Sequence, residues 1–273
     1  MRKIGFVSAA IALACVLTFM PCMAWAADAN HTLVVFAAAS MTESMNKIAE
    51  LYAKEAPEVK IVYNFDSSGT LKTQIQEGAD CDIFISAGQR QMDQMDIAAD
   101  PAVNTEKLDF VLPGTRFNIV ANQVVLIVPK GVNPKGIGDF KDVATDKVAL
   151  VALGNSDVPV GQYSQEIYAN LGFWDQLNSE QKISFASNVK EVLSQVAAGA
   201  VDCGIVYSTD AATSDGVEIV ARAPEGSHRP IVYPAAILRR TKNEDKAKAF
   251  VGFLKGEVSA GVFEGIGFAI PEK

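Results

Sequence analysis

The chain has 273 residues, of which 49% are hydrophobic and 21% are charged, and its formal net charge at pH 7 is −8. This composition is typical of a globular protein with one large or two modest cores. No run of basic residues is longer than Arg239-Arg240, so the sequence shows no basic cluster that would bind nucleic acid or anionic lipid. We therefore expect no nucleic-acid partner.

Residues 1–26 are predicted to form a secretory signal peptide. Arg2 and Lys3 precede an apolar run that extends to about residue 20, and Ala24-Trp25-Ala26 follows as a small-residue cleavage site. The apolar run borders on the length of a membrane span, but Pro21 and the cleavage site follow it at once. We therefore expect cleavage near Ala26 and an exported, soluble, periplasmic protein.

The four cysteines bear on export and on stability. Lipoprotein anchoring is the less favoured alternative, because Cys22 follows a proline rather than a small residue and Cys15 lies inside the apolar run. After cleavage only Cys81 and Cys203 remain, in a compartment that permits a disulfide. Two separate buried thiols are favoured over one bridge, and both alternatives stay open.

From residue 32 onward, strand-like runs alternate with helix-like runs, which favours α/β layers with mainly parallel sheets. Strands are predicted at residues 32–38, 59–65, 82–86, 117–128, 147–151, 182–186, 202–207, 217–221 and 230–238, and helices at residues 41–54, 70–77, 88–98, 162–171, 189–198, 243–254 and 256–264. Gly78, Gly172 and Gly199 follow helices as predicted left-handed caps.

Two long strand-like segments indicate how the chain divides. Residues 117–129 are long enough to leave one core and enter another, and residues 230–239 can carry the chain back. We expect a first lobe from 27–116 and 231–273, with 117–230 inserted as a second lobe, joined by two crossing hinge strands. Periodicity alone is also compatible with a single doubly wound sheet of nine strands.

Five strand-to-helix turns are candidates for an anion site, because ligands of open α/β sheets bind where helix N-termini present free N–H groups. The first turn, VVFAAAS at 34–40, ends in Ser40, which with Glu43 forms a predicted capping box. The second, NFDSSGT at 64–70, contains Ser68. Each serine alone would be read as a helix cap. Because the two turns lie in consecutive strand–helix units, neighbouring strands should bring them together.

The remaining three turns offer other donors. LGNSDVPVGQY at 153–163 contains Val160, and the turn at 186–189 contains Val189 after the predicted N-cap Asn188. Both valines can donate only through their backbone N–H groups. In the fifth turn, Tyr207 ends an apolar strand, and its hydroxyl can project past the sheet. If these turns bind no ligand, the one with Val160 is a connecting loop, the one with Val189 is an ordinary helix start, and Tyr207 is a core residue.

An enzymatic function finds little support. A serine hydrolase acting through Ser40 or Ser68 needs a nearby base, and the only histidines are His31, near the mature N-terminus, and His228, in a polar turn. The sequence has no Gly-x-Ser-x-Gly, no Walker-type phosphate loop and no zinc-ligand spacing. A secreted serine hydrolase is therefore only a distant alternative to a binding protein.

Several segments, in this order, resemble the periplasmic molybdate-binding proteins that feed ATP-driven importers, which are type II periplasmic solute-binding proteins. The segments are FAAAS at 36–40, SSGTL at 67–71, DVPVGQYS at 157–164, LGFWD at 171–175, GIVYSTDA at 204–211 and YPAAIL at 233–238. The similarity covers residues 32–270.

The resemblance implies a two-lobed fold that closes over a tetrahedral dianion, molybdate or tungstate, without a cofactor or a direct metal ligand. It makes Ser40 and Ser68 donors through hydroxyl and backbone, Val160 and Val189 donors through backbone N–H, and Tyr207 a donor through its phenol. The partner it implies is an ABC permease in the membrane. We expect the protein to act as a monomer.

The sequence departs from the family pattern at the ligand loops. Gly69 stands where a third serine is common, and Val160 where alanine is frequent. Asp66 and Asp157 border the loops, and if they face the ligand they would repel a dianion or accept from a protonated one. The alternative ligand is therefore another oxyanion, such as sulfate or phosphate.

Overall fold

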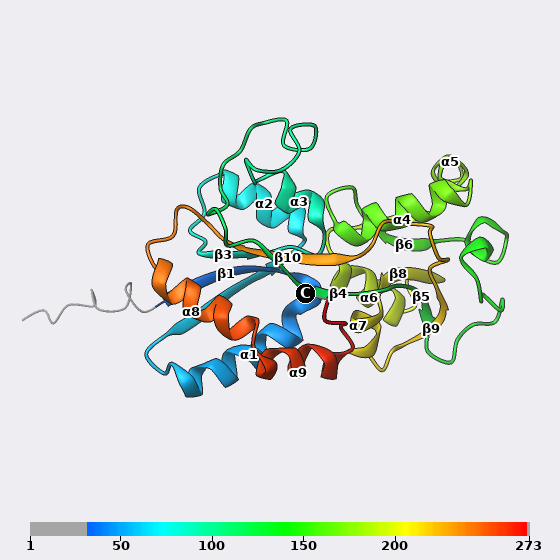
Figure 1. Ribbon diagram of the computed structural model, residues 1–273. Helices are drawn as coiled ribbons and strands as arrows, with labels where there is room; N and C mark the ends of the chain where they lie inside the picture. The colour runs from blue at the N-terminus through cyan, green and yellow to red at the C-terminus, as the bar shows by residue number, and fades with distance from the viewer. Residues whose placement is uncertain (1–31, 272–273) are drawn as a thin grey trace, which may run out of the picture. The chain divides into compact units, whose positions relative to one another are not determined.

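The computed structural model describes residues 32–271, and the predicted signal peptide, residues 1–26, lies outside them. The strands form two five-stranded sheets, in the orders β2-β1-β3-β10-β4 and β7-β6-β8-β5-β9 (Figure 1). Among the described residues, no helix is long and apolar enough to span a membrane.

The first sheet and the helices on it form the first lobe. Its strands are β1 (Thr32–Ala38), β2 (Lys60–Asp66), β3 (Ile83–Ile85), β4 (Phe117–Ala121) and β10 (Val232–Ile237). Its helices are α1 (Thr42–Glu55), α2 (Ser68–Gln76), α3 (Gln89–Asp93), α8 (Glu244–Leu254) and α9 (Glu257–Ile266), with a short 3-10 turn, η1 (Ala39–Met41), before α1.

The alternation of side chains along β1 explains why helices cover both faces of this sheet. Leu33 and Val35 belong to the large core that includes residues of α1, α8 and α9. Phe36, which points the opposite way, packs in a smaller core with Leu71 of α2 and Met92 of α3. Figure 1 accordingly shows α2 and α3 on one face, and α1, α8 and α9 on the other.

The second sheet and its helices form the second lobe. Its strands are β5 (Val124–Pro129), β6 (Val151–Gly154), β7 (Ile183–Ala186), β8 (Cys203–Tyr207) and β9 (Val217–Arg222). Its helices are α4 (Pro159–Asn170), α5 (Trp174–Ser179), α6 (Val189–Ala197) and α7 (Ser208–Ala212), with a 3-10 turn, η2 (Phe140–Ala144), before β6.

Each sheet is mixed rather than purely parallel, with one strand running against the other four. In the first sheet β10 is antiparallel to β3 and β4, whereas β1 is parallel to β2 and β3. In the second sheet β5 is antiparallel to β8 and β9. The reversed strands are β5, by which the chain enters the second sheet, and β10, by which it re-enters the first. The predicted two-lobed α/β fold is confirmed.

Several predicted boundaries were wrong. The strand predicted at 117–128 is two strands, β4 and β5, which belong to different sheets. The strand predicted at 147–151 is displaced to β6, and the helix predicted at 88–98 ends with α3 at Asp93. The helices α5 and α7 were not predicted. The left-handed caps were confirmed, with φ of +98° at Gly78, +79° at Gly172 and +67° at Gly199.

The capping box predicted at Ser40 was also wrong. Helix α1 begins at Thr42 after Met41, whose side chain makes no capping hydrogen bond. Ser40 lies in the preceding 3-10 turn. The two cysteines are free and buried, Cys81 in the first lobe and Cys203 in the second, so of the two alternatives the structure has separate thiols.

Candidate functional site

A small cavity lies between the two lobes. It is lined by Ala38, Ala39, Ser40, Asp66, Ser67, Ser68, Ala87, Val158, Pro159, Val160, Val189 and Tyr207. All five residues predicted to donate to an anion are among them. They come from the turns after β1, β2, β6, β7 and β8, because the carboxyl ends of those strands face the space between the lobes.

Ser40 lies in the 3-10 turn after β1, and the small residues Ala38 and Ala39 beside it let the backbone approach the cavity. Its hydroxyl lies 3.0 Å from the hydroxyl of Tyr233 on β10. Both side chains are buried, so this pairing satisfies polar groups that would otherwise be costly to bury.

Ser68 is the first residue of α2, which begins two residues earlier than predicted. The helix cap is Ser67, whose side chain accepts from the N–H of Thr70 at 3.1 Å. The Ser68 hydroxyl instead accepts from the N–H of Ala87 at 2.9 Å, which leaves its own proton free to donate.

Val160 and Val189 lie in the first turns of α4 and α6, where backbone N–H groups have no acceptor within the helix. Helix α4 begins at Pro159, three residues earlier than predicted, because proline suits the first helical position. The predicted cap of α6 is confirmed, since the Asn188 side chain accepts from the N–H of Glu191 at 3.1 Å. Both valine N–H groups therefore carry the partial positive charge of a helix N-terminus.

Tyr207 is the last residue of β8, and its hydroxyl donates to the Ala87 carbonyl across the lobes at 3.4 Å. Burial, reinforced by the neighbouring Tyr233, raises the pKa of Tyr207 well above its usual value. The phenol therefore stays protonated and neutral, and to reach an anion its one proton would have to turn away from this long bond to the Ala87 carbonyl.

The two aspartates are placed differently. Asp66 lines the cavity, where its Oδ1 accepts from the N–H of Ser67 at 2.7 Å and lies 3.5 Å from Nδ2 of Asn188. Asp157 is not among the lining residues. Its backbone carbonyl instead packs against Gly69 of the first lobe, so close that a Cβ on Gly69 would lie 2.3 Å from the oxygen.

A charged contact also joins the lobes beside the cavity. The Lys190 ammonium, on α6, lies 2.8 Å and 2.9 Å from the two carboxylate oxygens of Glu43, on α1. It also lies 3.3 Å from the buried carboxylate of Asp210. The first turn of α6, which holds Val189, is thus attached to the first lobe.

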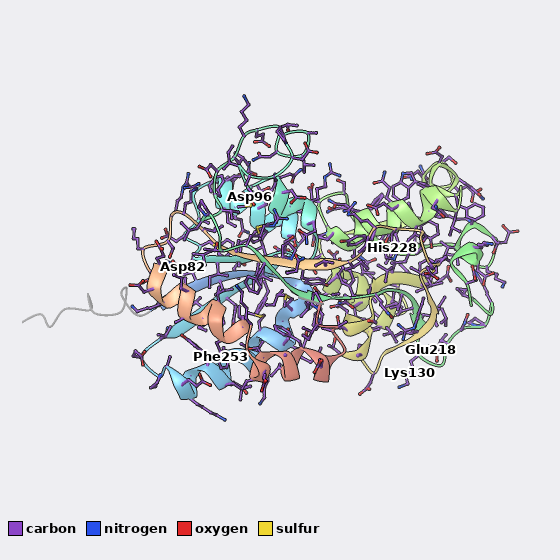
Figure 2. The ribbon with its side chains drawn as sticks, viewed as in Figure 1. Asp82, Asp96, Lys130, Glu218, His228 and Phe253 are labelled. Atoms are coloured by element: carbon purple, nitrogen blue, oxygen red, sulfur yellow. The ribbon has the colours of Figure 1, made fainter. Side chains whose placement is uncertain are left out.

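His228 does not provide a base for a serine nucleophile. Figure 2 shows it beside α4, where its ring packs edge-on against Tyr163 at a centroid distance of 5.7 Å. Its Nδ1 lies 2.7 Å from the Arg229 carbonyl, and it does not line the cavity. The other histidine, His31, lies outside the described residues.

Within residues 32–271 there is no cluster of three or more His, Cys, Asp or Glu side chains that could hold a metal ion. Apart from Asp66, the cavity lining is uncharged. Sequence reasoning did not identify Tyr233, Asn122 or Gly69 as parts of the site's support. Of these, Tyr233 lay in YPAAIL and Gly69 in SSGTL, two segments that resembled the family, whereas Asn122 lay in none of them.

Comparisons with known proteins agree with this geometry. Residues 33–269 match the model of a family described as bacterial extracellular solute-binding protein. The chain is 38% identical over 245 residues to the molybdate-binding protein ModA of Escherichia coli strain K12, covering 87% of this chain and 89% of that protein. It is 36% identical to a putative ABC transporter substrate-binding lipoprotein, YvgL, of Bacillus subtilis strain 168, and the match covers 87% of this chain and 86% of that protein.

Among solved structures, the periplasmic molybdate-binding protein of Azotobacter vinelandii superposes with a TM-score of 0.74 at 26% identity, covering 88% of this chain and 100% of that chain. The sequence match extends over both sheets and over every turn that lines the cavity. The chain therefore belongs to the bacterial extracellular solute-binding protein family, and it is a binding protein rather than an enzyme.

Proposed function

We propose that the protein captures molybdate in the cavity between its lobes and delivers it to the permease of an ABC transporter. The observation that carries this proposal is that the five predicted donors, which come from both lobes, line one small cavity. The names of the relatives from Escherichia coli and Azotobacter vinelandii, both molybdate-binding proteins, support the same ligand.

The donors are suited to a tetrahedral dianion. A buried dianion must replace its hydration shell, and each hydrogen bond to a charged group contributes about 1.5–3 kcal/mol. Two serine hydroxyls with their backbone N–H groups, two valine N–H groups and one phenol would supply roughly seven such bonds. The helix N-termini at Val160 and Val189 add favourable partial charge, so no cationic side chain is needed.

Selectivity among oxyanions follows from the same lining. Phosphate carries a proton at neutral pH, and five neutral donors offer that proton no acceptor. The one carboxylate in the lining is that of Asp66, whose Oδ1 already accepts from the Ser67 N–H. Sulfate is an unprotonated dianion and would be excluded by size. Tungstate is nearly the same size as molybdate, and we propose that it binds as well.

The setting we propose is the periplasm, after cleavage near Ala26, with the mature protein acting as a monomer. The first lobe would comprise residues 27–116 and 231–273, and the second lobe residues 117–230. Because the relative YvgL is named a lipoprotein, acylation at a cysteine is the alternative. The mass of the mature N-terminal peptide distinguishes the two, since acylation adds lipid to a terminal cysteine.

The test is isothermal titration calorimetry of the mature protein against molybdate, tungstate, sulfate and phosphate at neutral pH. We expect one-to-one binding of molybdate and tungstate and no heat from the other two. Binding of sulfate or phosphate alone would keep the anion site but replace the ligand. No heat from any of the four would overturn the proposal.

A further inference from the structure

Three side chains far apart in the sequence form a hydrogen-bonded chain that ends in the cavity. The amide nitrogen of Asn122, between β4 and β5, lies 3.3 Å from the hydroxyl of Tyr233. That hydroxyl lies 3.0 Å from the hydroxyl of Ser40, which lines the cavity. Tyr233 is fully buried, so its hydroxyl has no access to water that could replace these partners.

The direction of this chain is set at Asn122. The backbone N–H of Gln123, which can only donate, lies 2.8 Å from Oδ1 of Asn122, and the Ser208 hydroxyl lies 3.1 Å from the same atom. The Nδ2 group therefore faces the other way. It donates to Oγ1 of Thr209 at 2.8 Å and to the Tyr233 hydroxyl.

The remaining directions follow from the hydroxyl groups. Because the Tyr233 hydroxyl accepts from Asn122, its own proton is left to donate, and the Ser40 hydroxyl, 3.0 Å away, is the acceptor at hydrogen-bond distance. Burial raises the pKa of Tyr233 well above its usual value, so that proton is retained. Ser40 then accepts from Tyr233, and its own proton is left for the cavity.

We infer that Asn122 and Tyr233 are positioning residues that make Ser40 a hydrogen-bond donor to the oxyanion, an inference that rests on the proposed function. Ser68 has the same arrangement by a different route, because it accepts from the Ala87 N–H. Ser40 and Ser68 thus each accept a hydrogen bond from another group of the protein and keep their own proton to donate. Asn122, which lies between β4 and β5, contacts Thr209 of the second lobe and Tyr233 of the first. It therefore connects this arrangement to the segment where the chain crosses between the lobes.

The first test uses an isosteric substitution to reverse the direction of the hydrogen bonds from residue 122 to Ser40. In Asn122→Asp, the carboxylate accepts from Tyr233, Tyr233 accepts from Ser40, and Ser40 turns a lone pair toward the anion. The added charge also weakens anion binding. The same substitution is therefore made in the Tyr233→Phe background, where the charge remains but the hydrogen bonds that connect residue 122 to Ser40 are lost. We expect Asn122→Asp to weaken molybdate binding about tenfold more with Tyr233 present than with phenylalanine.

The second test asks whether Tyr233 acts through Ser40. Tyr233→Phe should weaken molybdate binding by about three- to tenfold in the otherwise unchanged protein. In the Ser40→Ala background, the same change should have no further effect. This second cycle does not require the Asn122→Asp variant, so it decides the inference even if that variant fails to fold. Circular dichroism and the ligand-free melting temperature establish folding for every variant.

The outcomes separate the inference from the proposed function. If the unchanged protein gives no heat with molybdate, the proposed function fails. If the unchanged protein binds molybdate but the effects in both cycles are simply additive, the proposed function stands and the positioning role of Asn122 and Tyr233 is overturned. Coupling in the second cycle supports Tyr233, and coupling in the first extends the role to Asn122.

Discussion

A Cβ on Gly69 would lie 2.3 Å from the carbonyl oxygen of Asp157, a separation that real side chains do not show. Gly69 belongs to α2 in the first lobe, and Asp157 precedes α4 in the second. The lobes therefore meet at a position that requires the absence of a side chain. This contact accounts for the glycine at position 69.

Gly69→Ala should weaken molybdate binding about tenfold or more, because the lobes cannot close to this separation. The ligand-free protein should not be destabilised, since alanine inside a helix is favoured over glycine by about 0.5–1 kcal/mol. Calorimetry gives the affinity, and thermal unfolding gives the stability. The matched control is Gly252→Ala, inside α8 of the same lobe, where an added Cβ meets nothing within 4 Å. Equal affinities for the two variants would contradict this reading of the contact.

The ion pair between Glu43 and Lys190 exists only while the lobes are in contact. The two side chains are 41% and 26% exposed, so the pair is partly screened by water. We expect Glu43→Gln to weaken molybdate binding about two- to fivefold, with a smaller loss at high salt. The control is Glu50→Gln, which removes an ion pair with Lys47 within α1. A loss of affinity in the control as large as in Glu43→Gln would mean that the effect is not interlobe.

Asp210 should make stability depend on pH. Burial raises its pKa from 3.8 to about 6, against the opposing attraction of Lys190 and with a smaller contribution from Glu43. Because the pKa is higher in the folded state, the stabilisation from the protonated form is complete below about pH 4 and is lost as the pH rises to about 6. The loss is roughly 3 kcal/mol.

The measurement is urea unfolding of the wild type and of Asp210→Asn between pH 4 and 7. Asparagine does not titrate, so the stability of the wild type relative to the variant should fall across this interval. Other carboxylates titrate in both proteins and cancel in the difference. A difference that stays constant with pH would show that Asp210 does not change its charge in the folded protein over this range.

The location of the site could be predicted because it depends on local patterns. Ser40 and Ser68 each follow a strand, Tyr207 ends one, and Val160 and Val189 follow helix-start signals. A strand end is recognisable within about ten residues of sequence, and the topology of α/β sheets brings such ends together. The two lobes were expected from the long strand-like segments together with the family resemblance, because the pattern of strands and helices alone was also compatible with a single sheet.

What could not be predicted depends on pairs distant in the sequence. Ser40 was expected to cap α1 with Glu43, but the structure pairs Ser40 with Tyr233, 193 positions away, and Glu43 with Lys190, 147 positions away. A capping box is a local alternative for the same polar groups, and here tertiary partners replace it. The close approach of Gly69 to Asp157 likewise has no local signature, because it depends on how the lobes meet.

Tyr207 should contribute one donor among several, so Tyr207→Phe should weaken molybdate binding by about three- to tenfold rather than abolish it. The loss should be the same from pH 6 to pH 9, because burial raises the pKa of this phenol and keeps its proton in place. The matched control is Tyr168→Phe, since Tyr168 is also fully buried in the second lobe, and its hydroxyl has no hydrogen-bond partner among the described residues. Calorimetry across this pH range measures both variants. An affinity of Tyr207→Phe equal to that of Tyr168→Phe would remove Tyr207 from the set of ligand donors, whereas a loss that grows toward pH 9 would mean that the wild-type phenol is not held protonated.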